Sequence, residues 1–177
     1  MPAGRPRASS RATIEEAAGE LFLERGYAAT SLADIAQRAG VARATLFAYV
    51  SAKSDLLWLE VDDALDVLEA ALDRGEPAST ALAGALDGCR VPLAVGQAEA
   101  MGVADELPES GRQRTARLEH LLARADGDHG LAARVRHRAL AAAISVGWEA
   151  WALAGSARDP LRRYVDDALA VLREGVE

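Results

Sequence analysis

One segment of the chain combines a cation, hydroxyl groups and aromatic rings at helical spacing and contains no acid. Residues 41–54 read VARATLFAYVSAKS. On a helix, Leu46 and Val50 share one side, and the opposite side is left free to contact a ligand. Arginine can donate two hydrogen bonds to guanine, and alanine or phenylalanine can contact the methyl group of thymine. The candidate base contacts on this free side are Arg43, Ala44, Phe47 and Ala48.

Groups that can bind phosphate flank this segment. Thr45 and Tyr49 lie on its edges and carry hydroxyl groups, and Lys53 follows it. A helix predicted to begin at Ser31 would also present free backbone N–H groups to a phosphate. Arginines 5, 7 and 11 at the N-terminus could reach phosphates or a minor groove. The candidate phosphate contacts are Thr30, Ser31, Thr45, Tyr49 and Lys53.

Three short helices must position these residues. Apolar residues at helical spacing predict a first helix from about Ser10 to a stop at Gly26. Ser31 and Asp34 form a capping box that predicts the start of a second helix, and Gly40 allows a tight turn before a third helix at 42–50. Two short helices joined by such a turn form a helix-turn-helix. We therefore predict a flexible basic arm at 1–9 and a DNA-binding domain at 10–52.

The rest of the chain is also predicted to be helical. Hydrophobic residues make up 50% of the sequence, and the most frequent of them is alanine, a strong helix former. These features predict an all-α fold of about nine helices, with a second domain at 53–177. The helices expected in that domain span 54–74, 79–89, 92–102, 110–126, 131–154 and 159–174.

Charge and residue usage exclude several classes of function. The net charge is −7, yet residues 1–60 hold equal numbers of cations and acids, an asymmetry typical of a nucleic-acid-facing N-terminus. One cysteine, no signal peptide and no membrane-spanning run predict a cytoplasmic protein. The three histidines and Cys89 have no zinc-site spacing, and phosphate-binding glycine loops and nucleophile elbows are absent. We expect no enzyme activity, metal or cofactor.

The segment from Arg11 to Leu57 resembles the DNA-binding domain of TetR-type transcriptional repressors. Ala42 stands where that family commonly has serine, and Phe47 stands where tyrosine is common, so a capping hydroxyl and a phenolic phosphate contact are lost. The residues that carry the resemblance are Gly26-Tyr27, Thr30-Ser31, Asp34-Ile35-Ala36, Ala39-Gly40-Val41, Thr45-Leu46, Tyr49, Lys53 and Leu56.

The resemblance implies a ligand-responsive homodimer that represses transcription from a palindromic operator. In the family, the last two helices pair across the two-fold axis, and a small effector in the C-terminal domain changes the separation of the two readers. The dimer contacts implied here are Ile144, Trp148, Trp151, Leu161, Val165, Leu169 and Leu172. The candidate effector pocket contains Trp58, Cys89, Met101, His120, Trp148 and Trp151.

Other interpretations fit the same residues. Phe47 and Tyr49 could belong to the core of the three-helix domain, Arg43 could be a solvated surface charge, and the tryptophans could be packing residues. The cationic run at 112–117 could attract an anionic ligand or simply face solvent. The main alternative function is a helical ligand- or protein-binding dimer whose helix-turn-helix does not read DNA.

Overall fold

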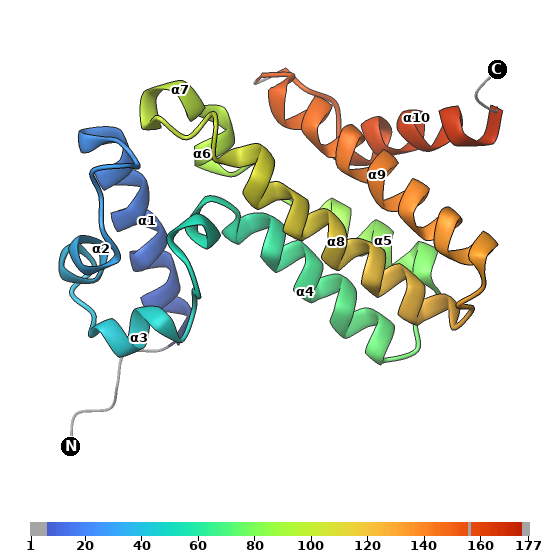
Figure 1. The fold of residues 1–177 in the computed structure, drawn as a ribbon, viewed down its shortest axis with the longest axis horizontal. Helices are drawn as coiled ribbons and strands as arrows, with labels where there is room; N and C mark the ends of the chain where they lie inside the picture. Colours follow the sequence, from blue (N-terminus) through green and yellow to red (C-terminus); the bar gives the residue numbers. More distant parts are fainter. Residues whose placement is uncertain (1–6, 156, 175–177) are drawn as a thin grey trace. The chain divides into compact units, whose positions relative to one another are not determined.

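The structure of the protein is a computed structural model that describes residues 7–155 and 157–174, with side chains from Arg11 onward. Over these residues the chain forms ten α-helices, one short 3-10 helix and no β-strand (Figure 1), which confirms the predicted all-α fold. The helices are α1 (Arg7–Arg25), α2 (Leu32–Arg38), α3 (Arg43–Phe47), η1 (Lys53–Leu57), α4 (Leu59–Asp73), α5 (Ala78–Asp87), α6 (Leu93–Gly96), α7 (Ala98–Met101), α8 (Leu107–Asp126), α9 (Leu131–Leu153) and α10 (Leu161–Glu174).

The helix boundaries differ from the predicted ones at several places. The first helix already begins at Arg7, so the last part of the predicted arm is helical, while Arg5 lies outside the described residues. The third helix is shorter than predicted and ends at Phe47. The predicted helix at 92–102 is divided at Gln97, whose backbone (φ −127°, ψ 28°) is not helical.

The predicted helix at 54–74 is also divided, by a local hydrogen-bonded turn. The backbone N–H groups of Ser51 and Ala52 both donate to Oδ2 of Asp55, each at 2.9 Å. These bonds favour the tight helix η1, which ends at Trp58 before α4 begins. Asp55, the third residue of η1, therefore caps the start of this helix. The arrangement is half of a capping box, because Ala52 has no hydroxyl to accept a hydrogen bond in return.

The chain forms two compact units. The first contains the chain up to Leu59 together with Pro92–Ser110, and the second contains Glu60–Val91 together with the chain from Gly111. The sequence placed everything after residue 52 in one domain. The packing groups α6 and α7 with the helix-turn-helix instead, because these short helices contact α1 and η1.

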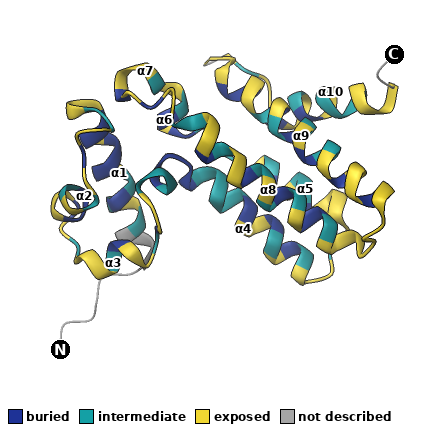
Figure 2. Ribbon diagram, in the orientation of Figure 1, coloured by how far each residue is buried: buried dark blue, intermediate teal, exposed yellow. Residues whose placement is uncertain are grey.

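The first unit is built around side chains from α1, α2 and α3. Leu21, Ile35 and Leu46, one from each helix, are completely buried (Figure 2). The N–H of Tyr27 donates to the carbonyl of Met101 at 2.7 Å, which ties the end of α1 to the end of α7. Residues far apart in the sequence thus complete one core.

The second unit has a close contact between α9 and α10. A Cβ atom at Gly147 would lie 2.8 Å from the carbonyl oxygen of Tyr164 and 2.9 Å from Cα of Val165. Only glycine permits this approach, because backbone atoms cannot move aside as a flexible side chain can.

None of the helices in the described part of the chain is long and apolar enough to cross a membrane.

Candidate DNA-binding surface

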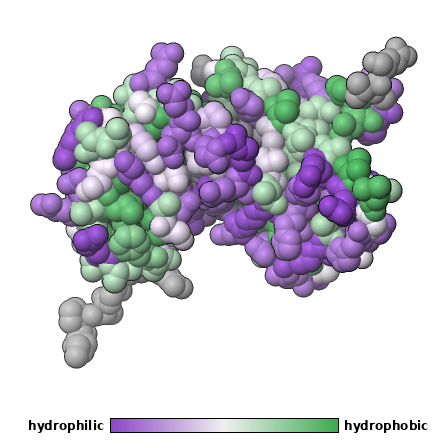
Figure 3. All heavy atoms as spheres, in the orientation of Figure 1, coloured by the Kyte–Doolittle hydropathy of each residue, from purple (hydrophilic) through white to green (hydrophobic). Residues whose placement is uncertain are grey.

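Helix α3 has one buried and one exposed side. Leu46 and Val50 are 0% and 3% exposed, so they fix the helix to the core of the first unit. On the face seen in Figure 3, hydrophobic surface is present over the part of this unit that contains α3. The exposed side carries the four residues predicted to contact bases, Arg43, Ala44, Phe47 and Ala48.

The turn before α3 and the cap of α2 set the direction of these two helices. Gly40 adopts φ +64° between them, a conformation that glycine reaches without strain. Ser31 accepts a hydrogen bond at 3.2 Å from the N–H of Asp34, and the Ser31 N–H donates to the Asp34 carboxylate at 2.9 Å. The predicted capping box is therefore present.

The same carboxylate changes the interpretation of Ser31. The Ser31 hydroxyl donates to Oδ2 of Asp34 at 2.6 Å, and this bond, followed by the bond from the backbone N–H, lowers the pKa of Asp34. A negative carboxylate thus already occupies the position where the sequence predicted a phosphate. Ser31 therefore caps α2 in this structure.

Thr30 is a second predicted phosphate contact that the structure places elsewhere. Its side chain is 2% exposed, and its hydroxyl donates to the carbonyl of Gly26 at 2.9 Å. The hydroxyl closes the turn that follows α1 and does not face solvent. A buried hydroxyl must find an internal partner, and a sequence pattern does not show burial.

Lys53 also points into the protein. Its Nζ donates to the carbonyls of Tyr27 at 2.8 Å and Thr30 at 3.0 Å, and lies 4.0 Å from the centroid of the Tyr27 ring. The ammonium group therefore holds the turn between α1 and α2. Thr45 and Tyr49, the remaining predicted phosphate contacts, are half-buried along the edges of α3.

The ring that Lys53 covers is itself partly buried. Tyr27 packs against Phe22 with ring centroids 5.2 Å apart. Burial raises the pKa of Tyr27 to about 12, and the nearby charges of Glu106 and Asp55 act in the same direction. This phenol is therefore neutral at any physiological pH.

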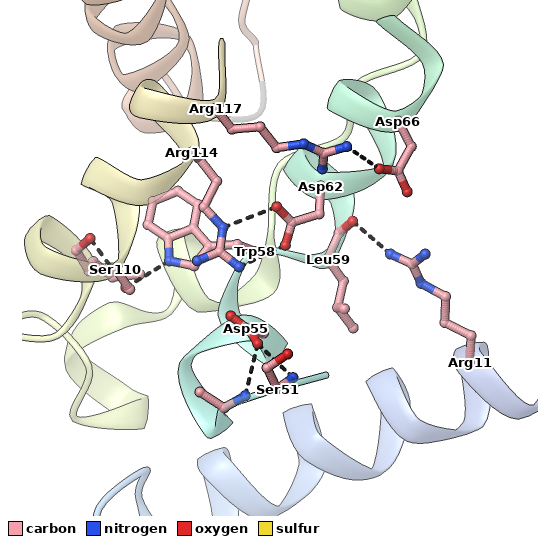
Figure 4. Close-up of polar contacts among 12 residues, drawn as sticks. Arg11, Ser51, Asp55, Trp58, Leu59, Asp62, Asp66, Ser110, Arg114 and Arg117 are labelled. Carbon is pink, nitrogen blue, oxygen red and sulfur yellow. Dashed lines mark hydrogen bonds and ion pairs between the residues drawn. The ribbon is translucent and has the colours of Figure 1, made fainter. Parts of the chain in front are cut away.

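Other cations of the first unit are held by internal partners. Arg38 of α2 donates to Glu20 at 2.9 Å and to Glu24 at 2.7 Å, both on α1. The hydrogen bond to Arg38 is the main cause of the lowered pKa of Glu24, and the two carboxylates raise the pKa of Arg38. Arg11 donates to the carbonyl of Leu59 at 2.9 Å (Figure 4). These arginines position helices.

The six predicted effector-pocket residues are divided between the two units. Trp58 and Met101 are buried in the first unit, where the indole N–H of Trp58 donates to the hydroxyl of Ser110 at 2.8 Å (Figure 4). In the second unit, Cys89 and Trp148 are close together. Burial raises the pKa of the Cys89 thiol, and the nearby indole of Trp148 partly opposes that shift.

The two remaining pocket candidates, His120 and Trp151, also belong to the second unit. His120 is exposed. Trp151 is 8% exposed and is covered by the guanidinium of Arg158, 5.2 Å from its ring. Their positions differ because α8 turns His120 to solvent while α9 turns Trp151 inward.

The cationic run in α8 is used within the second unit. Arg114, which is 8% exposed, donates to both carboxylate oxygens of Asp62 on α4, at 2.7 and 3.1 Å (Figure 4). Arg117 pairs with Asp66 and Glu69 of the same helix. The sequence offered these arginines as candidates for an anionic ligand, but acids of α4 neutralise them.

The sequence analysis did not predict two polar contacts between α8 and α9. The hydroxyls of Thr115 and Ser145 lie 3.0 Å apart between α8 and α9. His137, only 3% exposed, places Nε2 at 2.8 Å from Oδ2 of Asp126. Neither contact has a local sequence signal, because the partners come from different helices.

Among the described residues, no group of histidine, cysteine, aspartate and glutamate could hold a metal ion.

Most of the predicted dimer contacts are buried within one chain. Ile144 and Trp151 of α9 and Leu161 and Val165 of α10 are at most 8% exposed, while Trp148 and Leu169 are half-buried and Leu172 is 39% exposed. The side of α9 that the sequence assigned to a partner is packed inside the chain, and the assignment was ambiguous because that helix is apolar around most of its circumference. Its exposed apolar side chains are Leu131, Val135, Val146 and Leu153.

Known proteins resemble this chain over its whole length. The profile of "Bacterial regulatory proteins, tetR family" matches residues 14–57, which include α2 and α3. An HTH-type transcriptional repressor of Mycobacterium tuberculosis, Rv3405c, is 34% identical over 196 aligned positions that cover 98% of this chain and 93% of that protein. An HTH-type transcriptional regulator of Mycobacterium bovis, Mb3439c, matches to the same extent.

Two further similarities are shorter or weaker. A proposed regulator of mycofactocin biosynthesis in Mycobacterium tuberculosis, MftR, is 39% identical over 70 residues, and the match spans only 35% of that protein and 40% of this chain. The solved structure of NalD, the secondary repressor of a multidrug efflux pump in Pseudomonas aeruginosa, is 20% identical, with coverage of 93% and 97% and a TM-score of 0.42. That structural similarity is too low to support an argument about this chain.

Proposed function

This chain belongs to the tetR family of bacterial regulatory proteins, and on that premise we propose that it is a repressor that binds a palindromic operator as a homodimer. Its general function is DNA-binding regulation of transcription, since the family consists of transcriptional regulators. We further propose that it represses transcription, that its operator is palindromic and that a small molecule releases it from DNA.

The observation that carries the proposal is the division of α3 into two sides. Leu46 and Val50 fix the helix to its unit, and Arg43 and Phe47 project from the other side. A recognition helix needs this arrangement, because base edges in the major groove can be reached only by exposed side chains on a firmly held helix. A ligand- or protein-binding dimer that does not read DNA would not need exposed side chains on a firmly held α3.

The dimer is supported by the exposed side of α9. Leu131, Val135, Val146 and Leu153 are 61–77% exposed and recur at helical spacing over the length of this helix. Large apolar side chains that share one exposed side of a helix are candidates for an interaction site in a soluble protein. A two-fold contact through this side of α9 would give a dimer, and a dimer of helix-turn-helix readers binds half-sites about 34–36 Å apart.

The proposal of an effector rests on the second unit alone. Cys89 and Trp148 place a thiol and an indole together, with the Thr115 and Ser145 hydroxyls on the neighbouring stretch of α8 and α9. A small molecule that binds there releases the operator only if it binds the DNA-free conformation more tightly. A thermal-shift screen against metabolites tests this part, and Trp148→Phe should weaken the response to any ligand that stabilises the protein.

The experiment that tests the function is a mobility shift with the DNA upstream of the gene for this chain, at two salt concentrations. We expect a discrete complex that weakens as salt rises, because phosphate contacts release counterions. A scrambled duplex of equal length should bind much more weakly. Equal binding of both duplexes would contradict a specific reader. Absence of any complex at low salt would favour the ligand- or protein-binding alternative.

A further inference from the structure

We propose that Phe47 and the alanines beside it recognise the 5-methyl group of a pyrimidine, so that the operator half-site is selected mainly by thymine methyl groups next to one guanine. This inference rests on the proposed function, since it assumes that the exposed side of α3 enters the major groove. It adds the chemical group that is recognised and the residue that recognises it.

The first step is the set of atoms that α3 offers to DNA. The exposed residues of the segment 42–48, all of which the structure describes, are Arg43, Phe47 and three alanines. Among these side chains only the Arg43 guanidinium can donate a hydrogen bond. Arginine discriminates guanine by two hydrogen bonds to O6 and N7. The other four of these five side chains offer only carbon atoms, while the hydroxyls of Thr45 and Tyr49 lie half-buried along the edges of the helix.

The second step is that three polar side chains of the same unit already bond inside the protein. Thr30 is buried with its hydroxyl bonded to the Gly26 carbonyl, and the Lys53 ammonium is bonded to the carbonyls of Tyr27 and Thr30. Arg38 is paired with two glutamates of α1. Two side chains that the sequence made available for hydrogen bonding to DNA, Thr30 and Lys53, are therefore used inside the protein.

The third step is the exposure of the ring itself. Phe47 is 48% exposed, while the adjacent Leu46 is completely buried and Val50 is 3% exposed. The backbone that carries the ring is thus held by the core on the opposite side of the helix. A large apolar side chain at a fixed position loses little conformational entropy on binding and gains from burial against another apolar group.

The final step is the chemistry of the groove. Among the groups that standard base pairs display in the major groove, the thymine methyl group is the apolar one, and 5-methylcytosine presents the same group. The carbon-rich side of α3 therefore matches a 5-methylpyrimidine and has no partner for the amino group of an unmethylated cytosine. Loss of one such methyl group should weaken binding by about fourfold.

The experiment begins with selection of a consensus duplex from a random library by the full-length chain. Each thymine of that consensus is then replaced by deoxyuridine, which removes only the methyl group, and by 5-bromodeoxyuridine, whose bromine is close to a methyl group in size. We expect one position per half-site at which deoxyuridine lowers affinity about fourfold and about tenfold or more when both half-sites are changed. Bromodeoxyuridine should restore the affinity.

Protein variants assign that effect to the ring. Phe47→Ala should bind the thymine and deoxyuridine duplexes within twofold of each other, while Phe47→Leu, which keeps an apolar side chain, should retain most of the discrimination. Val67→Ala, a change at a 52% exposed apolar residue of α4, is the matched control and should discriminate as the parent does. Thermal unfolding of each variant checks that the fold is unchanged.

The outcomes separate the two levels of the proposal. Failure to enrich any consensus would overturn the proposed function and this inference with it. A consensus without thymine in its half-sites, or affinities unaffected by deoxyuridine at every position, would overturn methyl recognition and leave the repressor intact. Full discrimination in Phe47→Ala would show that another residue recognises the methyl group, which also contradicts the inference.

Discussion

Arg43 and Lys53 are cations ten residues apart, yet the structure gives them opposite surroundings. Arg43 is exposed on α3, whereas the Lys53 ammonium is bonded to two backbone carbonyls and lies over the Tyr27 ring. From sequence, both were expected to contact DNA. At the scale of single residues, burial and hydrogen-bond partners therefore distinguish the structural role of Lys53 from the DNA contact proposed for Arg43.

Arg43→Ala should weaken operator binding by about 1–3 kcal/mol and relax preference at a single base pair, because one bidentate contact to guanine is lost. Stability should change by less than about 0.5 kcal/mol, since the residue is exposed. Fluorescence anisotropy with operator variants at each position measures the first effect, and urea unfolding measures the second. A uniform loss of affinity across all sequences would instead assign Arg43 to a phosphate.

Lys53→Met should lower the free energy of unfolding by about 1–2 kcal/mol in the absence of DNA, because two hydrogen bonds from a charged donor and a cation–π contact are lost. Arg43→Met removes a cation of the same segment without internal partners to lose, and serves as the control. Urea unfolding of both variants measures the difference. If Lys53→Met unfolds like the parent and only its DNA affinity falls, the phosphate contact expected from the sequence is correct.

At the scale of elements, a polar contact joins the end of α8 to α9 in the second unit. Asp126 at the end of α8 accepts a hydrogen bond from Arg136 at 2.7 Å and contacts Nε2 of His137 at 2.8 Å, both on α9. The bond from Arg136, followed by that with His137, lowers the pKa of Asp126. This carboxylate therefore binds protons less readily in the folded chain than in the unfolded one.

The lowered pKa predicts a dependence of stability on acid. Because the folded pKa lies below the unfolded value of about 3.9, the contribution of Asp126 is complete above that pH and is lost as the pH falls through the folded pKa. Asp126→Asn should be less stable than the parent at pH 7, and the difference should shrink below about pH 4. Urea unfolding over this range measures it, with Asp128→Asn as control. A constant difference at every pH would contradict the assignment.

At the scale of the whole molecule, the exposed side of α9 is the feature that a monomer leaves unexplained. Side chains expected at the dimer contact, among them Ile144 and Val165, are instead buried between α9 and α10 of one chain. The close approach at Gly147 makes that pairing possible. A partner subunit would therefore meet Leu131, Val135, Val146 and Leu153.

Val146→Arg should convert the proposed dimer to a folded monomer, because a charge at the centre of an apolar contact would lose its water without gaining a partner. Val67→Arg on α4, at a residue of similar exposure, should leave the association unchanged. Sedimentation velocity at micromolar concentration measures the mass, and binding to a palindromic operator should weaken with the dimer. A parent chain that is already monomeric, or a variant that remains dimeric, would reject this surface.

The sequence by itself determined the helical fold, the position of the helix-turn-helix and the two sides of α3, because these depend on periodicity and caps within a few residues. The Ser31–Asp34 cap and the burial of Leu46 and Val50 are examples. Only the tertiary structure decided which polar groups remain available to DNA and which side of α9 stays open. Lys53 became internal, and residues 92–110 joined the first unit, through contacts between segments distant in sequence, which local patterns do not encode. The Thr30 hydroxyl bonds to a carbonyl only four residues away, but its burial depends on the packing around it.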